Sequence, residues 1–247
     1  MLPTTLLLSA FAALAATSPV VKRSAGPGCG APSRAPVLPK TGGTSDLPNP
    51  DSGLALKHIA LGFGIQNYTC KANATATATG ALAMLYDITH LYPRQGAESL
   101  PLQEFNNLTS KALWTHKVPL NMNGNGPGAS QTNPFPPDAP LQLQGQRPLP
   151  FLGHHYFDAA GVATFNLDSG KIHLPCSKIS QVDAPKGADK GPEGTGAVGW
   201  LYLGGKDGAV GAKFVYRVLT AGGATHGCDK VSGTDSTSYT ATYWFYG

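Results

Sequence analysis

The feature that most constrains the fold of this chain is the alternation of side chains in its last segment, residues 238–246. One side of an extended chain carries Tyr239, Ala241, Tyr243 and Phe245, and the other carries Thr240, Thr242, Trp244 and Tyr246. Successive side chains of a β-strand point to opposite faces, so a period of two residues predicts a strand. A strand this rich in aromatic rings has to be buried on at least one face, which requires a packed sheet.

Further strands are expected throughout the second half of the chain. They lie at residues 151–157, 162–167, 171–179, 197–203 and 213–220. Turn-forming residues separate them, as in Asp168-Ser169-Gly170 and the glycine-rich residues 204–208. Many short strands with Gly and Pro in the turns predict a mostly β domain, built as an antiparallel β-sandwich or barrel.

Fewer helices and strands are expected in the first half of the chain. Residues 54–61 and 65–70 are interpreted as two strands broken at Gly62-Phe63-Gly64, and residues 81–88 as a third, buried strand. Residues 99–114 are expected to form the one short helix, because apolar side chains recur there at helical spacing. These side chains are Leu102, Phe105, Leu108 and Ala112, with Ser99 as a candidate N-cap and Pro101 in the first turn.

The start of the chain predicts export from the cell. Residues 1–16 contain an apolar run of signal-peptide length that ends in Ala13-Leu14-Ala15, a pattern that signal peptidases recognise. Residues 17–53 are expected to form a flexible leader, in which Lys22-Arg23 is either a processing site or a solvated charge pair. Residues 54–247 then form a single β domain, with a long Pro/Gly-rich loop at about residues 119–150 that is either functional or disordered.

Two further sets of residues agree with export from the cell. Three sequons make Asn67, Asn73 and Asn107 candidate glycosylation sites at the surface of the domain. The four cysteines are expected to form disulfides in an oxidising compartment, and their spacing matches no zinc-binding pattern. They are Cys29, Cys70, Cys176 and Cys228. Sequence spacing leaves their pairing open.

The charge of the chain excludes two classes of partner. Charged residues make up 13% of the sequence, the formal net charge is +4, and no basic cluster occurs in the β domain. Nucleic acids and anionic membranes therefore have no electrostatic basis for binding. The apolar run near the start is too short to span a bilayer, so no membrane span is expected.

Several blocks of residues occur in an order that carries a family resemblance. They are Ala60-Leu61-Gly62, Gln66-Asn67-Tyr68-Thr69-Cys70, Leu152-Gly153-His154-His155-Tyr156-Phe157, Thr164-Phe165, Trp200-Leu201, Val215-Tyr216-Arg217-Val218-Leu219-Thr220-Ala221-Gly222-Gly223, Cys228 and Tyr243-Trp244-Phe245-Tyr246. Together they resemble the signature of a secreted domain of unknown function found in fungi and bacteria.

The resemblance covers about residues 54–247 and implies a fold and an extracellular location more than a reaction. It implies a Cys70–Cys228 disulfide, and Cys29–Cys176 follows only by elimination. His58 departs from the family pattern, because relatives tend to carry an aromatic residue there.

Fungal members of that family are often labelled malate dehydrogenase, an activity that needs a dinucleotide site. Gly62-Phe63-Gly64-Ile65-Gln66-Asn67 approaches the GxGxxG pattern, and Asp87 follows about 20 residues later. Such a site also needs a third glycine and a helix that begins there to hold the pyrophosphate. Asn67 occupies the third position, and the Thr/Ala alternation of residues 75–79 does not favour that helix. No cofactor is therefore expected, and a dehydrogenase is disfavoured.

Three histidines form the candidate metal-binding or catalytic set: His154, His155 and His173. His154 and His155 are neighbours in a predicted strand and would point to opposite faces, so they cannot bind one ion without a bulge. One of them could instead pair with His173, which follows across two turns. The favoured interpretation is a histidine hydrogen-bonded within an aromatic sheet, with no metal bound.

The sequence shows no assembled set of catalytic residues for a hydrolase. The sequence has no GxSxG motif, and most of its carboxylates lie in predicted turns. Ligand contacts are expected from His154, Tyr156 and Arg217, because extracellular β domains often bind sugars on aromatic rings. Arg217 lies on the strand face opposite Tyr216 and Val218, so it is either a rim charge or a binding cation.

The sequence thus favours an uncharacterised secreted glycoprotein, a non-catalytic extracellular or cell-wall module with a binding or structural role. Its expected partner is an extracellular polysaccharide or another surface component. The alternative is a secreted hydrolase or metal-dependent enzyme that uses the region of His154, His155 and His173.

Overall fold

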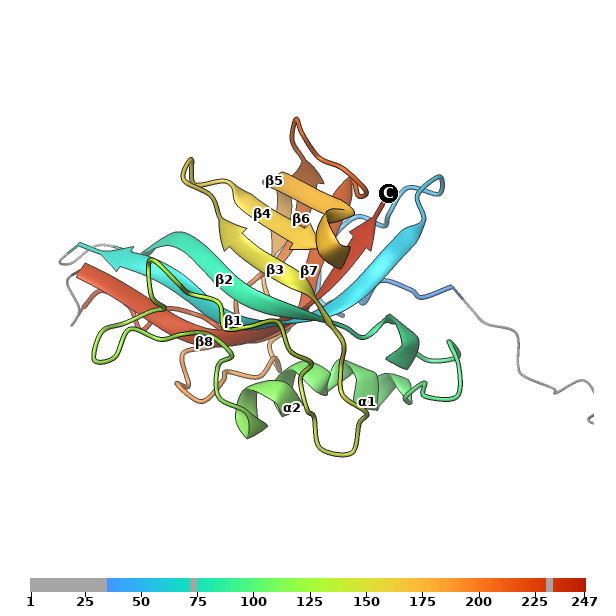
Figure 1. The fold of residues 1–247 in the computed structure, drawn as a ribbon, viewed down its shortest axis with the longest axis horizontal. Coiled ribbons are helices and arrows are strands. Elements are labelled where there is room, and N and C mark those ends of the chain that lie inside the picture. The colour runs from blue at the N-terminus through green and yellow to red at the C-terminus, as the bar shows by residue number, and fades with distance from the viewer. Residues whose placement is uncertain (1–34, 72–74, 230–232) are drawn as a thin grey trace, which may run out of the picture. The chain divides into compact units, whose positions relative to one another are not determined.

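The chain folds into a closed antiparallel β-barrel (Figure 1), as a computed structural model of residues 35–71, 75–229 and 233–247 describes. Its strands are β1 (Leu56–Cys70), β2 (Thr77–Asp87), β3 (Phe151–Phe157), β4 (Ala163–Leu167), β5 (Ile172–Val182), β6 (Trp200–Gly205), β7 (Phe214–Gly222) and β8 (Gly233–Tyr246). Each strand pairs with the next in chain order, and β8 pairs with β1. The predicted barrel is therefore confirmed. The sandwich alternative is wrong, because one closed sheet replaces two stacked sheets.

Strand β1 corrects the predicted break at residues 62–64. It runs unbroken through them, and its glycines pair with β2 and β8 instead of turning the chain. A Cβ atom on Gly64 would overlap the backbone carbonyl of Leu82, and one on Gly62 would overlap the ring of Tyr243. These glycines therefore serve close packing inside the barrel, where a larger residue has no space.

Two short helices replace the single helix that was predicted. Helix α1 spans Leu102–Asn106 and α2 spans Leu108–Thr115, separated at Asn107. The N-cap position of α1 is Pro101 and not the predicted Ser99. The hydroxyl of Ser99 instead accepts hydrogen bonds from the backbone N–H groups of Gln95 and Gly96. Two single-turn 3₁₀ segments, η1 (Thr89–Leu91) and η2 (Asp168–Gly170), complete the regular structure of the described residues.

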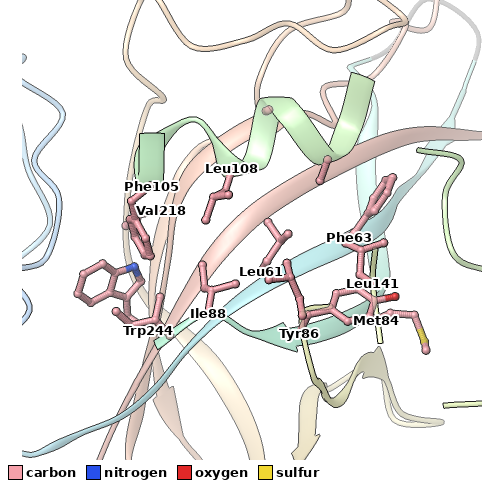
Figure 2. Close-up of a cluster of buried hydrophobic side chains, with 14 of the residues drawn as sticks. Leu61, Phe63, Met84, Tyr86, Ile88, Phe105, Leu108, Leu141, Val218 and Trp244 are labelled. Carbon is pink, nitrogen blue, oxygen red and sulfur yellow. The ribbon is translucent and has the colours of Figure 1, made fainter. Parts of the chain in front are cut away.

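The helices cover the outer face of the barrel along β1, β7 and β8 (Figure 1). Between helices and strands lies a hydrophobic cluster, here named the outer core. In Figure 2, Phe105 and Leu108 of the helical segment lie over Leu61, Val218 and Trp244 of the strands. The outer core is thus built from the outward-pointing side chains of the barrel wall.

Two segments without regular structure also contribute to the outer core. The loop at residues 119–150 was expected to be functional or disordered, yet four of its leucines are buried in this cluster. They are Leu120, Leu141, Leu143 and Leu149. Leu38 and Leu47 of the described part of the leader are buried there as well. Both segments therefore act as covers for the barrel wall.

The inward-pointing side chains form a second cluster, here named the inner core. Its large members are aromatic: Phe165 packs edge-on against both Tyr243 and Phe245. Beside them the strands carry small residues, such as Ala60, which pairs with Tyr243, and Ala241, which lies on the same strand as Tyr243 and Phe245. Small residues next to large rings allow the rings to fit inside the barrel.

Candidate ligand-binding site

The inner core does not fill the barrel, because a cavity of about 710 Å³ lies inside one end. This end is formed where β1 finishes and β2 begins, and residues 224–225 border it after β7. Apolar side chains make up most of the lining, among them Ala81, Phe157 and Leu203. An eight-stranded barrel has room for one small ligand, and ligand pockets of roughly 300–1,000 Å³ are common.

Five side chains in the lining of this cavity carry polar groups and are buried: Gln66, Tyr68, His155, Arg217 and Tyr243. They come from β1, β3, β7 and β8. The alternation of each strand places them on the inner face together with the inner core. The site therefore combines apolar walls with a few fixed polar groups, the usual composition of a small-molecule site.

Arg217 is the charged group of this set and is only 8% exposed. Its Nη1 donates to Oε1 of Gln66 at 3.3 Å, and its Nη2 donates to the carbonyl oxygen of Gly199 at 2.9 Å. Its Nε has no hydrogen-bond acceptor among the described residues. Arg217 is thus a buried residue of the cavity lining and not a charge on the rim of the barrel.

His155 is a neutral imidazole beside this cation. Its Nδ1 lies 3.0 Å from the carbonyl oxygen of Thr164, so Nδ1 carries the proton and donates. Its ring stacks on Phe165 with 4.1 Å between ring centres. Burial lowers the pKa of His155 to about 4, and the charge of Arg217 acts in the same direction. The unprotonated Nε2 is therefore available only as an acceptor.

Cys176 also lines the cavity, as a buried free thiol. Its Sγ donates to the carbonyl oxygen of Ala163 at 3.2 Å, and burial raises its pKa to about 12. A free thiol is at odds with the expected Cys29–Cys176 disulfide, whose other member lies outside the described residues. The hydrophobic position of Cys176 inside β5 explains why it packs as a small apolar side chain.

The Cys70–Cys228 disulfide is present, as the resemblance implied. It joins the end of β1 to the segment that follows β7, next to the cavity-lining Thr225. Asp235 accepts hydrogen bonds from Oγ1 of Thr225 at 2.8 Å and pairs with Nδ1 of His226 at 2.9 Å. Burial alone would raise the pKa of Asp235, but the hydrogen bonds from His226 and Thr225 lower it. These contacts hold the edge of the cavity in place.

The structure separates the three histidines of the predicted metal set. His155 points into the barrel, whereas His154 lies on the outer face, where it packs against Phe135 and lies 3.4 Å from Asp138. His173 shares the outer face with His154, with Asn166 of β4 paired between them. Among residues 35–71, 75–229 and 233–247, no group of three His, Cys, Asp or Glu side chains is placed to hold a metal ion.

The remaining predicted surface residues lie outside the cavity. Tyr156 is on the outer face and is half-buried beside Phe135. Asn107 is exposed between the helices, whereas Asn67 is half-buried in β1 and accepts a hydrogen bond from Ser236 at 2.7 Å. Asn73 lies outside the described residues. Of the predicted ligand contacts, only Arg217 therefore belongs to the cavity.

The dinucleotide-like segment has a different structural role. Residues 62–67 lie within β1, so the segment does not begin a helix. Asp87 ends β2 and pairs with Nδ1 of His58 at 3.0 Å. His58, which departs from the pattern of the family resemblance, therefore has a defined partner in the structure.

Sequence reasoning missed several residues of the cavity. Gln66, Tyr243 and Lys178 were not predicted to bind anything, and Cys176 was assigned only to a disulfide. A usable signal was present in β1, where Ala60, Gly62, Gly64 and Gln66 share one face. A strand face that carries residues this small leaves space inside a barrel, and a polar side chain in that space is a candidate ligand contact.

Comparisons with known proteins give one match. The model of a family described as "Protein of unknown function (DUF3455)" matches residues 50–247. No curated protein and no solved structure matches the chain. Within the described residues, no helix combines the length and apolar character needed to cross a membrane.

Proposed function

The chain belongs to the DUF3455 family, whose function is unknown, and we propose that it is a binding protein that holds a small, mostly apolar molecule inside its barrel. The cavity of about 710 Å³ carries this proposal, because it opens into the barrel between apolar walls. We also infer that the protein is secreted and acts outside the cell or at the cell wall, from the signal-peptide pattern of residues 1–16.

The chemistry of the cavity supports binding over catalysis. Cys176 and His155 both line it, but a Cys–His pair needs a thiolate beside a protonated imidazole. Burial favours the opposite protonation states, a neutral thiol and a neutral imidazole. It raises the pKa of Cys176 to about 12 and lowers the pKa of His155 to about 4. No Asp or Glu lies in the cavity lining among the described residues, so the pair of carboxylates that a glycosidase needs is missing there.

The cavity also favours a small molecule over a polysaccharide chain. Sugar chains bind on exposed aromatic platforms, but the rings of Tyr243, Trp244 and Trp200 are fully buried in the two cores. Trp114 is an exposed exception at 60%, and its Nε1 donates to Asp189 at 2.8 Å. The other ring among the exposed large hydrophobic side chains of the described residues, Phe157 at 37%, lines the cavity from β3, whereas Trp114 belongs to α2. One isolated ring on each element does not form a platform for a chain of sugars.

A neutral fluorescent probe, N-phenylnaphthylamine, tests this proposal. We expect saturable binding with one probe per chain and a rise in fluorescence on transfer into the apolar cavity. The variant Ala163→Trp fills space at the cavity wall and should abolish that binding. The matched control is Ala160→Trp, which changes an exposed turn residue outside the lining and should bind as the unchanged protein does. Equal binding by both variants would contradict the proposal.

A further inference from the structure

The cavity carries an unbalanced positive charge. Its charged lining residues are all basic: Arg217 inside, with the exposed Lys178 and Lys206 toward the solvent. Within the described residues, no Asp or Glu belongs to the lining. A concave apolar site with charges of one sign attracts molecules of the opposite charge, because low-dielectric walls focus the field.

The guanidinium of Arg217 is a buried charge without an anionic partner among the described residues. A buried charge is stable when a counter-charge pairs with it, and burial without one costs several kcal/mol. The partners of Arg217 are all neutral: the amide oxygen of Gln66, the carbonyl oxygen of Gly199 and the phenol of Tyr243. No carboxylate of the described residues lies within ion-pair distance of Arg217, since the ion pairs found there involve other groups.

One candidate for an internal counter-ion, Asp235, has other partners. Asp235 lies on the same end of the barrel, but its carboxylate accepts from Thr225 and from the backbone N–H of His226, and it pairs with the His226 ring. These partners satisfy both of its oxygens. The protein therefore supplies no free carboxylate for Arg217 in this part of the barrel.

We propose, building on the function proposed above, that the natural ligand is an organic acid with an apolar body, and that its carboxylate pairs with Arg217. The planar guanidinium matches a carboxylate and donates two parallel hydrogen bonds to it. Gln66 acts as a positioning residue, because its side chain is fixed from both ends: Oε1 accepts from Arg217, and Nε2 donates to the carbonyl oxygen of Gly80 at 2.6 Å. The apolar body of the ligand then lies against the walls near Ala81 and Leu203.

One buried cation selects for one negative charge. A phosphate monoester carries almost two negative charges and needs further donors around it. The other two cations, Lys178 and Lys206, have exposed side chains. They attract a negatively charged ligand toward the cavity but do not contact its buried headgroup. A monocarboxylate therefore fits the charge inside the barrel.

Matched pairs of acid and alcohol test this inference. Decanoate is compared with decanol, and naphthoate with naphthalenemethanol, by competition against N-phenylnaphthylamine and by calorimetry. Charge-assisted hydrogen bonds predict that the unchanged protein binds at least one acid roughly tenfold or more tightly than its alcohol. The variant Arg217→Met should remove this preference, so that acid and alcohol bind it with affinities within about threefold of each other.

A second variant, Gln66→Glu, tests the same preference with Arg217 retained, and circular dichroism checks that both variants fold, because Gln66→Glu loses the hydrogen bond from Nε2 to the carbonyl oxygen of Gly80. Gln66→Glu places a carboxylate where an oxygen already lies 3.3 Å from Arg217, and it should remove the preference for acids while Arg217 is retained. Equal affinity for acid and alcohol in the unchanged protein overturns the inference but leaves the binding function intact. An acid preference that survives in both variants also overturns it. Failure of N-phenylnaphthylamine and of every pair to bind overturns the proposed function as well.

Discussion

The two faces of the barrel wall are built from the same strands but in different ways. On the outer face of β1, Leu61, Phe63 and Ile65 are fully packed beneath the helices and loops. On the inner face of the same strand, Ala60, Gly62 and Gly64 leave room for rings that cross from other strands. The outer face is a filled, apolar layer, whereas the inner face ends in a cavity with buried polar groups.

This contrast teaches where the protein obtains its stability and where it keeps room for a ligand. Tight apolar packing contributes most where no void is left, so the outer core is expected to dominate stability. A cavity with an unpaired cation contributes less, and its polar groups cost free energy in the absence of a ligand. Four predictions test this division.

The largest effect is expected in the outer core. Phe105→Ala removes a fully buried ring and should lower the free energy of unfolding by about 3–5 kcal/mol. Leu203→Ala in the cavity wall should cost about 2 kcal/mol, the lower end for such a truncation, because this side chain already borders the cavity. Urea unfolding of both variants measures the difference. An equal loss of unfolding free energy in the two variants would contradict the idea that the outer core dominates stability.

The pH dependence of His155 should be nearly as large. Its pKa is about 4 in the folded protein and 6.5 when unfolded, so the unfolded chain binds the extra proton between these values. Stability should therefore fall by about 3 kcal/mol from pH 6.5 to pH 4 through this residue, and should not change through it above pH 6.5.

The variant His155→Phe keeps the ring and loses the titration. Urea unfolding at a series of pH values should give a smaller fall in stability on acidification for this variant than for the unchanged protein. Identical slopes for the two proteins would mean that His155 is accessible to water and that the inner face is wetter than the structure indicates.

A smaller effect is expected from adding a methyl group to the inner face. In Gly62→Ala the new Cβ overlaps the buried ring of Tyr243, which should cost about 2 kcal/mol. Because Tyr243 lines the cavity, the displaced ring should also weaken binding of N-phenylnaphthylamine. Gly96→Ala is the control, since nothing lies near its Cβ position, and it should change stability by less than about 0.5 kcal/mol. Thermal unfolding without a difference between the variants would argue against close packing at this point.

The smallest effect concerns the ion pair of His58 and Asp87, which lies outside the cavity lining. The hydrogen bond to Asp87 raises the pKa of His58. Burial alone would raise the pKa of Asp87, but hydrogen bonds from His58 and Thr89 lower it. The pair contributes fully between pH 3.8 and pH 6.5, and its contribution fades above the raised pKa of His58 and below the lowered pKa of Asp87.

Asp87→Asn should therefore cost about 1 kcal/mol near pH 5 and less near pH 9. Chemical denaturation at these two pH values measures this difference. A cost that is the same at both would show that the hydrogen bonds to Thr89, and not the charge of His58, give Asp87 its role.

Much of the barrel was predictable because local patterns report strands directly. The segment 151–157 was predicted to the residue, and the alternation of residues 238–246 identified a strand that extends back to Gly233. The break at Gly62-Phe63-Gly64 was wrong for a physical reason. A glycine that turns the chain and a glycine that admits a neighbouring ring look alike in one sequence.

The cavity was only partly predictable. Alternation placed Arg217 on the face opposite Tyr216, but it could not say which of the two faces would be inside. The histidines were grouped because they are close in sequence, whereas the barrel wall separates His154 from His155. Gln66 and Tyr243 approach Arg217 from distant strands, and no local pattern carries that information.

The sequence by itself determined the strands, the faces that their side chains share and the cysteines able to form bridges, because these follow from backbone geometry and from the chemistry of single residues. Closure of the sheet decided the rest. Pairing of β8 with β1 turned one face of every strand inward, and it brought a cation, an amide and two rings together around a space that they do not fill. Long-range strand pairing depends on the packing of the whole chain, so only the tertiary structure shows that this space exists.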